Sequence, residues 1–166
     1  MSEIEILAAG VQEAPGIAGL AGGIWREHYI PILGRAQVDY MLDKFQSPEA
    51  ICDQIRGGHL YFLIRSGNMD IGYFCVHSGE MPGEFCLSKL YIKKQARGKK
   101  AGKHAQEYIE GLARGRGFGK IVLFVNKQNT GAIRIYQKMG YRITDPVVRD
   151  IGNGFVMDDY RMEKVL

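Results

Sequence analysis

The strongest constraint on the fold is a segment in which an apolar strand, a basic loop and a helix follow one another directly. The strand-like run Leu87–Ile92 leads into a basic segment that contains Gly98 and Gly102, and residues with helical spacing come next. A loop of this kind leaves the first backbone N–H groups of the helix without partners inside the helix. Those groups, together with the positive end of the helix dipole, favour a bound anion such as phosphate. The order therefore predicts an anion-binding loop between a strand and a helix.

Positive charge gathers at the start of this helix. Arg97, Lys99, Lys100 and Lys103 crowd there without an acidic residue among them. The positive end of a helix normally favours carboxylates, so this crowding is unfavourable unless an anion binds. A run of solvated charge is the alternative interpretation.

Length and composition set broad limits. The chain has 166 residues, which suits a single domain over residues 1–166, and its net charge of +4 and pI near 8.9 suit an anionic cofactor better than nucleic acid. The N-terminus is acidic where a signal peptide would be basic, and no apolar run is long enough to span a membrane. We expect a cytoplasmic protein with no membrane or metal partner, whose cysteines are reduced thiols: Cys52, Cys75 and Cys86.

Turn signals and apolar periodicity divide the chain into helices and strands. Helices are expected at Ala14–Ile30 (broken by the segment Pro31 to Gly34), Ala36–Phe45, Pro48–Arg56, Ala101–Leu112 and Thr130–Met139. Strands are expected at Ile4–Ala8, Leu60–Arg65, Ile71–His77, up to Ile92, and at Ile121–Val125, Tyr141–Thr144 and Phe155–Val165. The strand, helix and strand around the basic loop form one crossover unit, so those two strands should be parallel. We expect a mixed α/β (α+β) fold, with a mostly antiparallel sheet of six to seven strands, one central parallel pair and flanking helices.

Two familiar glycine motifs do not fit. A P-loop needs four residues between its glycines and a Ser or Thr after the lysine, whereas Gly98 and Gly102 are separated by three residues and His104 follows Lys103. The second glycine-rich stretch, Gly115–Gly119, lies after a helix and before a strand, which is the reverse of a dinucleotide-binding loop. It is interpreted as the end of a helix.

Two other motifs fall in register on the expected elements. The first is Leu90-Tyr91-Ile92 followed by Arg97-Gly-Lys-Lys-Ala-Gly102, and the second is Asn129-Thr-Gly-Ala132-Ile-Arg-Ile-Tyr136-Gln-Lys-Met-Gly140-Tyr141. From about Leu87 to Arg142 the chain resembles the GCN5-related N-acetyltransferases, the GNAT family. Their pyrophosphate loop reads Arg/Gln-x-x-Gly-x-Gly/Ala, and their second signature reads Asn-x-x-Ala-x-x-x-Tyr-x-x-x-Gly-Phe.

One position departs from the family pattern. Lys100 stands at the first glycine of the loop motif. A frame that starts at Gln95 restores that glycine at Gly98 but loses the last one, so the Arg97 frame is kept because it preserves the distance from the strand. Either the Lys100 backbone is ordinary and its ammonium group reaches the ligand, or the cofactor sits slightly differently.

The resemblance implies that an amine attacks acetyl-CoA directly, with no metal and no covalent intermediate. The loop and the strand before it would hold the cofactor, and a backbone N–H at the end of the strand would stabilise the oxyanion. The cofactor-binding residues implied in this way are Leu90, Tyr91, Ile92, Arg97, Gly98, Lys99, Lys100, Ala101, Gly102, Lys103, Asn129, Ala132 and Tyr136. Asn129 has the alternative of acting only as a helix cap.

Proton transfer needs two further groups. Tyr136 is a phenol with an ordinary pKa of about 10, so it can protonate the leaving thiolate, although a tyrosine packed in the core is the alternative. Glu84 and His77 lie near the turn before the cofactor strand and are candidates for the base. Glu84 is preferred as the second catalytic residue.

The acceptor is predicted from a looser likeness. The C-terminal run Ile151–Lys164 is similar to bacterial polyamine acetyltransferases of the PaiA type, which implies a small amine acceptor. Asp158 and Asp159 are adjacent, so on a strand they point to opposite faces and at most one of them reaches a shared site. Asp158 is the residue assigned to bind the amine. Trp25, His28 and Tyr29 would wall its pocket, since aromatic faces attract cations, or would belong to the core. A protein or peptide acceptor, a catalytically silent module that binds CoA or nucleic acid, and a homodimer are alternatives left open.

Overall fold

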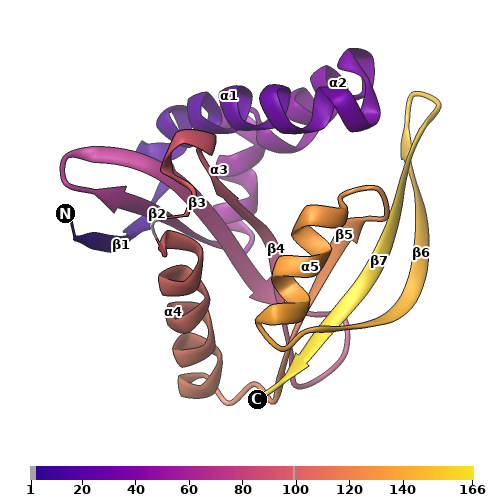
Figure 1. Cartoon of the computed structure of the whole chain (residues 1–166). Helices are drawn as coiled ribbons and strands as arrows, with labels where there is room; N and C mark the ends of the chain where they lie inside the picture. The colour runs from indigo at the N-terminus through magenta and orange to yellow at the C-terminus, as the bar shows by residue number, and fades with distance from the viewer. Residues whose placement is uncertain (1–2, 99) are drawn as a thin grey trace. The chain divides into compact units, whose positions relative to one another are not determined.

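The computed structural model describes residues 3–98 and 100–166 (Figure 1). Two compact units share the chain: Met1–His77 with Lys89–Ile109 forms the first, and Ser78–Ser88 with Glu110–Leu166 forms the second. The sheet has seven strands in the order β1-β2-β3-β4-β5-β7-β6. Strand β4 (Glu84–Ile92) and helix α4 (Ala101–Gly115) each begin in one unit and end in the other.

The first unit combines antiparallel strands with three consecutive helices. Strand β1 (Ile4–Ala9) pairs with β2 (Leu60–Ser66), and β2 pairs with β3 (Met69–Ser78). A short 3-10 turn (Val11–Glu13) precedes the helices α1 (Ala14–Leu33), α2 (Arg35–Gln46) and α3 (Pro48–Arg56). The apolar residues that the sequence pattern assigns to the interior are fully buried in this unit, among them Ile17, Ile51, Ile64, Tyr73, Phe74 and Ile109.

The second unit contains the parallel pair. Strand β5 (Lys120–Asn126) runs parallel to β4 and antiparallel to β7 (Phe155–Val165), which in turn pairs with the edge strand β6 (Arg142–Gly152). Helix α5 (Thr130–Lys138) connects β5 to β6 and lies over these strands in Figure 1. The expected mixed fold, with a mostly antiparallel sheet and one parallel pair, is confirmed.

The parallel strands separate soon after they begin. Their pairing joins Glu84–Cys86 to Lys120–Val122 and ends there among the described residues. Strand β5 nevertheless continues for four more residues, to Asn126.

Helix α1 is longer than expected. It continues through Pro31 to Leu33 and ends before Gly34, whose φ is 86°. Proline has no backbone N–H, so Pro31 removes one helical hydrogen bond. In the last turn of a helix the loss is limited to that single bond. The helix thus runs three residues past the expected end at Ile30, and within the expected break from Pro31 to Gly34 it is Gly34, with its positive φ, that ends it.

Strand β6 is also longer than Tyr141–Thr144, since it extends from Arg142 to Gly152. Pro146 lies within this strand and pairs with Tyr160, because an edge strand can dispense with one backbone donor. Two register shifts, at Ile143/Asp145 and Asp150/Gly152, interrupt the alternation that would have revealed the strand.

Candidate active site

The basic loop has the backbone conformation of a glycine-rich turn. After β4, a 3-10 turn (Lys94–Ala96) leads to Gly98 with φ 79° and Lys100 with φ 64°. The Lys100 carbonyl then accepts the N–H of His104 at 3.0 Å, which opens α4. Lys99, which the family motif assigns to the cofactor, lies outside the described residues.

Lys100 takes the left-handed conformation that its glycine counterpart would take. A residue with a Cβ atom pays about 1–2 kcal/mol for this conformation. The Lys100 backbone is therefore not ordinary. Lys100 immediately precedes Ala101, the buried first residue of α4.

The surroundings of the loop suit an anion. Arg97, Lys100 and Lys103 are exposed, and the first turn of α4 has no acidic residue. The Nε of Arg97 donates to the Ile92 carbonyl at 3.1 Å, which ties the loop to the end of β4. A guanidinium group has further donors, so this bond leaves it able to bind phosphate. The residues fit the pyrophosphate of acetyl-CoA.

The end of β4 lies close to β3 because of one glycine. A Cβ atom on Gly72 would stand 2.3 Å from the Tyr91 carbonyl oxygen, so no other residue fits at this position without movement. The N–H of Lys93 donates to the Ile71 carbonyl at 2.8 Å next to this contact. Gly72 therefore fixes the strand that contains Leu90, Tyr91 and Ile92, and the sequence alone gave no specific sign of its role.

Aromatic rings from α1 gather against Tyr91. The Trp25 ring lies 5.3 Å from that of Tyr91 and 5.6 Å from that of Tyr29. His28 packs edge-on against Tyr29 at 4.8 Å. Trp25 is buried, whereas His28 and Tyr29 are partly exposed. Of the three residues expected to wall an amine pocket, Trp25 and Tyr29 thus adjoin Tyr91 of the expected cofactor strand, and His28 packs on Tyr29.

The second motif builds the start of α5 in the second unit. The Asn129 side chain accepts the N–H of Ala132 at 3.4 Å, so it caps the helix, and it is buried. Tyr136 lies on the same helix, is partly exposed and packs against the Tyr141 ring at 5.4 Å. The cap and the tyrosine are set on one short helix that follows β5 directly.

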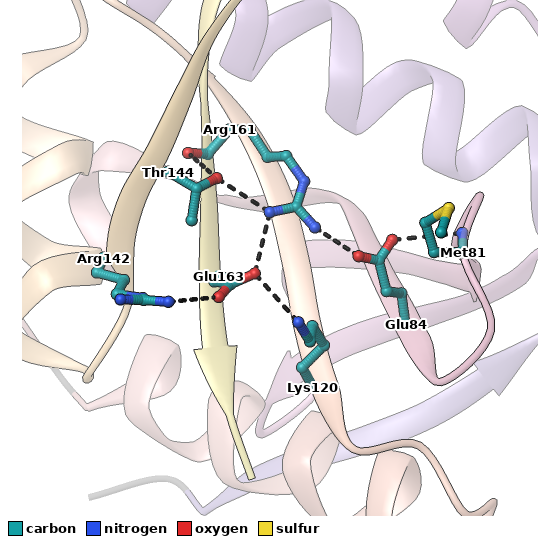
Figure 2. A network of polar contacts seen from close by, with 7 residues as sticks. All are labelled: Met81, Glu84, Lys120, Arg142, Thr144, Arg161 and Glu163. Atoms are coloured by element: carbon teal, nitrogen blue, oxygen red, sulfur yellow. Dashed lines mark hydrogen bonds and ion pairs between the residues drawn. The ribbon is translucent and has the colours of Figure 1, made fainter.

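Glu84 belongs to a network of polar contacts that Figure 2 shows from close by. We call this set the Arg161 network: Glu84, Lys120, Arg142, Thr144, Arg161 and Glu163. The two Nη atoms of Arg161 donate to Glu84 at 2.5 Å and to Glu163 at 3.0 Å, and the Glu84 carboxylate also accepts the Met81 N–H at 3.4 Å. Glu84 is thus buried and engaged on both oxygens.

The same network surrounds Glu163 with cations. Its carboxylate receives bonds from Arg142 and Arg161 at 3.0 Å each and from Lys120 at 3.4 Å. Bonds from Arg142 and Arg161, with the charge of Lys120, lower the pKa of Glu163 from 4.5 to about 2. Sequence reasoning missed Arg161, although acidic and basic residues alternate with period two along β7 and could have indicated a charged face.

The two adjacent aspartates on β7 behave differently. Asp158 is exposed and forms an ion pair with Lys127 at 2.7 Å. Asp159 is 3% exposed, and burial raises its pKa from 3.8 to about 6. The alternation expected for the two residues holds, and the residue expected to bind the amine, Asp158, already has a partner.

Comparisons with known proteins agree with this arrangement. The model of the acetyltransferase (GNAT) family matches residues 24–141 of the chain. The search of curated proteins gave no match. Among the described residues, no helix is both long and apolar enough to cross a bilayer.

Several solved structures share the fold. PaiA N-acetyltransferase from Thermoplasma acidophilum, in complex with coenzyme A, has 21% identity and a TM-score of 0.83, with 99% of each chain covered. A GCN5-related N-acetyltransferase structure from Rhodopseudomonas palustris has 16% identity and a TM-score of 0.84, covering 100% of this chain and 98% of that one. Ribosomal-protein-alanine N-acetyltransferase from Brucella melitensis has 16% identity and a TM-score of 0.69, covering 98% and 99%. At these identities the likeness establishes the fold.

Proposed function

Because this chain belongs to the GNAT family of acetyltransferases, we propose that it moves the acetyl group of acetyl-CoA to a primary amine of a small molecule such as a polyamine. Acetyl-CoA is the co-substrate, and the chain is an acetyl-CoA-dependent N-acetyltransferase. The acceptor and the residue roles that follow are our assignment.

The observation that carries the assignment is the loop conformation. Gly98 at φ 79° and Lys100 at φ 64° stand before α4 in the register of the family's pyrophosphate motif. We assign pyrophosphate binding to the backbone N–H groups of Gly98 and of residues 100–102, and to the exposed Arg97 and Lys103 side chains. The backbone of Leu90 and Ile92 on β4 would hold the pantetheine arm, with Tyr91 against the aromatic cluster.

The chemical step needs few groups. The neutral amine nitrogen attacks the acetyl carbonyl carbon, the C–S bond breaks, and the thiolate takes the hydroxyl proton of Tyr136. Tyr136 regains a proton from the nitrogen that has formed the amide, through solvent. A phenol has an ordinary pKa of about 10, so it carries this proton at pH 7. Asn129 holds the start of the helix that presents Tyr136.

Glu84 fits a holding role better than that of a base. Its two oxygens accept from Arg161 and from the Met81 N–H, so proton abstraction would require the ion pair to open. Removing one partner of a buried ion pair lowers the free energy of unfolding of the protein by several kcal/mol. We therefore assign to Glu84 the role of holding the Arg161 side chain in place. The substrate amine then loses its proton to solvent.

A thiol-release assay over a panel of amines tests the acceptor. The panel contains spermidine, putrescine, a monoamine and a peptide with an N-terminal alanine, each with acetyl-CoA. We expect release with the polyamines. Release with the peptide alone would favour the second candidate, a protein-amine acetyltransferase, for which the fold likeness to the Brucella melitensis enzyme speaks. No release with any amine would refute the small-amine assignment.

Thermal unfolding with acetyl-CoA, CoA and DNA tests the loop. A ligand that binds the folded state raises the unfolding temperature, and the stabilisation grows with the logarithm of its concentration divided by its Kd. Acetyl-CoA should stabilise the wild-type protein, and Arg97→Ala/Lys103→Ala should lose most of that stabilisation while Lys138→Ala, an exposed lysine on α5, retains it. Equal stabilisation of both variants would remove the two side chains from the cofactor site, and stabilisation by DNA alone would favour a nucleic-acid module.

A further inference from the structure

Two neutral side chains hold Lys89 of β4 in place. The Lys89 ammonium group donates to the Gln54 side-chain oxygen on α3 and to the Tyr61 hydroxyl on β2, at 2.7 Å each. It lies 5.1 Å from the centre of the Tyr61 ring. The Gln54 amide group in turn donates to the Phe45 carbonyl at the end of α2, at 2.9 Å. These bonds fix a flexible side chain in one position on the sheet.

Lys89 is positively charged in this setting. Amide and phenol oxygens accept hydrogen bonds from an ammonium group, and the face of a tyrosine ring attracts a cation. The charge acts on its surroundings, because it contributes to lowering the pKa of His59 to about 4, after burial and the charge of His77. Burial raises the pKa of Tyr61 above its ordinary value, so the phenol beside Lys89 stays protonated. The chain therefore keeps a fixed cation here.

A row of aromatic rings connects Lys89 with the wall expected for the acceptor. The Tyr61 ring lies 6.3 Å from that of Tyr73, which lies 5.7 Å from that of Tyr91. The Tyr91 ring lies 5.3 Å from that of Trp25. Lys89 and Tyr91 are two positions apart on β4, so their side chains point to the same face of the strand. Within the first unit, Lys89 and the aromatic wall therefore share one side of the cofactor strand.

The backbone between Lys89 and Tyr91 is that of Leu90, which the proposed function assigns to the pantetheine arm. An amine that attacks along the aromatic wall would meet the charge of Lys89 from the same side. Like charges repel, so a nearby cation disfavours the protonated form of an amine. Two unit charges about 10 Å apart, at an effective dielectric constant of about 20, repel enough to lower an ammonium pKa by about one.

The reaction needs a neutral amine. An alkylamine has a pKa near 10, so nearly all of it is protonated at pH 7, yet only the neutral form attacks. Glu84 is engaged by Arg161 and is not assigned as a base. We propose that the Lys89 charge drives the bound acceptor amine into its neutral form by repulsion. The inference rests on the proposed function and adds a fixed charge that acts in place of a base.

The step balances without another reactant. The ammonium nitrogen gives its proton to water, and the lone pair that remains forms the bond to the acetyl carbon as the C–S bond breaks. Repulsion weakens binding of the protonated amine and leaves the neutral amine unaffected. Lys89 therefore raises kcat and KM together, while kcat/KM stays nearly the same. A second ammonium group farther along a diamine is repelled less, because the interaction falls with distance.

The kinetic test compares Lys89→Met with Lys89→Arg, which keeps the charge, and with Lys94→Met, which removes an exposed lysine after β4. Tyr61 donates to Gln54 at 2.5 Å without the help of Lys89, so Lys89→Met should fold. At pH 7 and saturating acetyl-CoA, Lys89→Met should lower both kcat and KM for putrescine by about tenfold. Lys89→Arg and Lys94→Met should stay within about threefold of the wild type. A fall in kcat without a fall in KM, or no change in either, would overturn the proposal.

The pH profile gives a readout that lost packing alone would not change. In the wild type, the limb of kcat for putrescine should lie about one pH unit below the pKa of the free amine, and Lys89→Met should move it up by about one. A wild-type limb at the pKa of the free amine would refute the proposal even if the variant failed to fold. Trifluoroethylamine is already neutral at pH 7, so both proteins should have the same kcat and KM with it; a tenfold loss would contradict the proposal.

The titratable groups around Lys89 provide a control for the pH profile. They are Tyr61, His59 and Cys75, with His77 stacked on His59 at 4.2 Å. His77→Gln should leave the limb of kcat where the wild type has it. A limb that moves with His77→Gln and not with Lys89→Met would assign the effect to the histidine pair and refute the role of Lys89.

A binding measurement separates this inference from the proposed function. Calorimetric titration of putrescine into the CoA-saturated protein at pH 7 needs no turnover. Lys89→Met should bind putrescine about tenfold more tightly than the wild type and Lys94→Met do. This result supports the repulsion even if no thiol is released from acetyl-CoA, in which case only the proposed reaction fails. Equal binding by the three proteins, weaker binding by Lys89→Met, or no binding refutes the role of Lys89.

Discussion

The two ends of β7 place carboxylates of similar burial in opposite environments. Glu163, 6% exposed, lies at the end where β4 and β5 are paired and receives bonds from three cations. Asp159, 3% exposed, pairs with Asn126 near the other end of β7, where the charges of Arg149 and Lys127 act on it. Their pKa values differ accordingly, at about 2 and about 6. The comparison teaches that hydrogen bonds from cations stabilise the charged carboxylate at the first end, whereas burial destabilises the charged carboxylate at the second.

The largest effect is expected at the paired end. Arg161→Met should lower the free energy of unfolding by about 3 kcal/mol, because it leaves Glu84 and Glu163 buried without their shared cation. Urea denaturation at pH 7 measures this. Arg149→Met is the matched control at the other end, and it should cost less than about 1 kcal/mol since Arg149 is exposed. Equal losses in the two variants would erase the contrast.

At the other end, Asp159→Asn should stabilise the protein. The pKa of Asp159 is raised from 3.8 to about 6, so the folded state holds a proton that the unfolded state has lost between those values. Wild-type stability should therefore fall as the pH rises from about 4 to about 6, then stay level. The variant lacks this fall and should be more stable at pH 7 by roughly 1–3 kcal/mol. Urea midpoints across this pH range decide; a variant less stable than the wild type at pH 7 would contradict the account.

Glu163 should have the opposite dependence on pH. Its pKa is lowered from 4.5 to about 2, so its contribution to stability is complete above about pH 4.5 and declines as the pH falls towards 2. Glu163→Gln removes this part of the acid sensitivity, which we expect to be about 1 kcal/mol between pH 5 and pH 3. The free energy of unfolding is measured at pH 5 and pH 3 for the wild type and for Glu163→Gln. If it changes by the same amount in both proteins, the network does not hold Glu163 as a charged group.

The sequence predicted most of the fold because local signals and tertiary contacts agree over most of the chain. Ser47 and Pro48 begin α3 as expected, with the Ser47 hydroxyl accepting the Ala50 N–H at 3.1 Å. The strand, basic loop, helix and strand also follow their patterns, since each side of that crossover is buried. Strand β6 was predicted too short, because its pairing with β7 and not its own sequence pattern makes it a strand.

The candidate site was less predictable from the sequence. The motifs located the loop, but the left-handed conformation of Lys100 is a property of the folded turn. The alternation of Asp158 and Asp159 indicated that the two differ, yet which of them faces the helices depends on the register between β5 and β7. The ion pair of Glu84 with Arg161 joins residues 77 positions apart, and no local pattern reveals such a contact.

The most direct test of the central claim is to follow both products of one reaction. Wild-type protein, acetyl-CoA and putrescine are mixed, free thiol is measured, and the amine and the protein are weighed by mass spectrometry. The account predicts one acetylated amine for each thiol released and no acetyl group on the protein. Thiol release without acetylated amine, or acetyl groups found on the protein instead, would contradict direct transfer to a small amine.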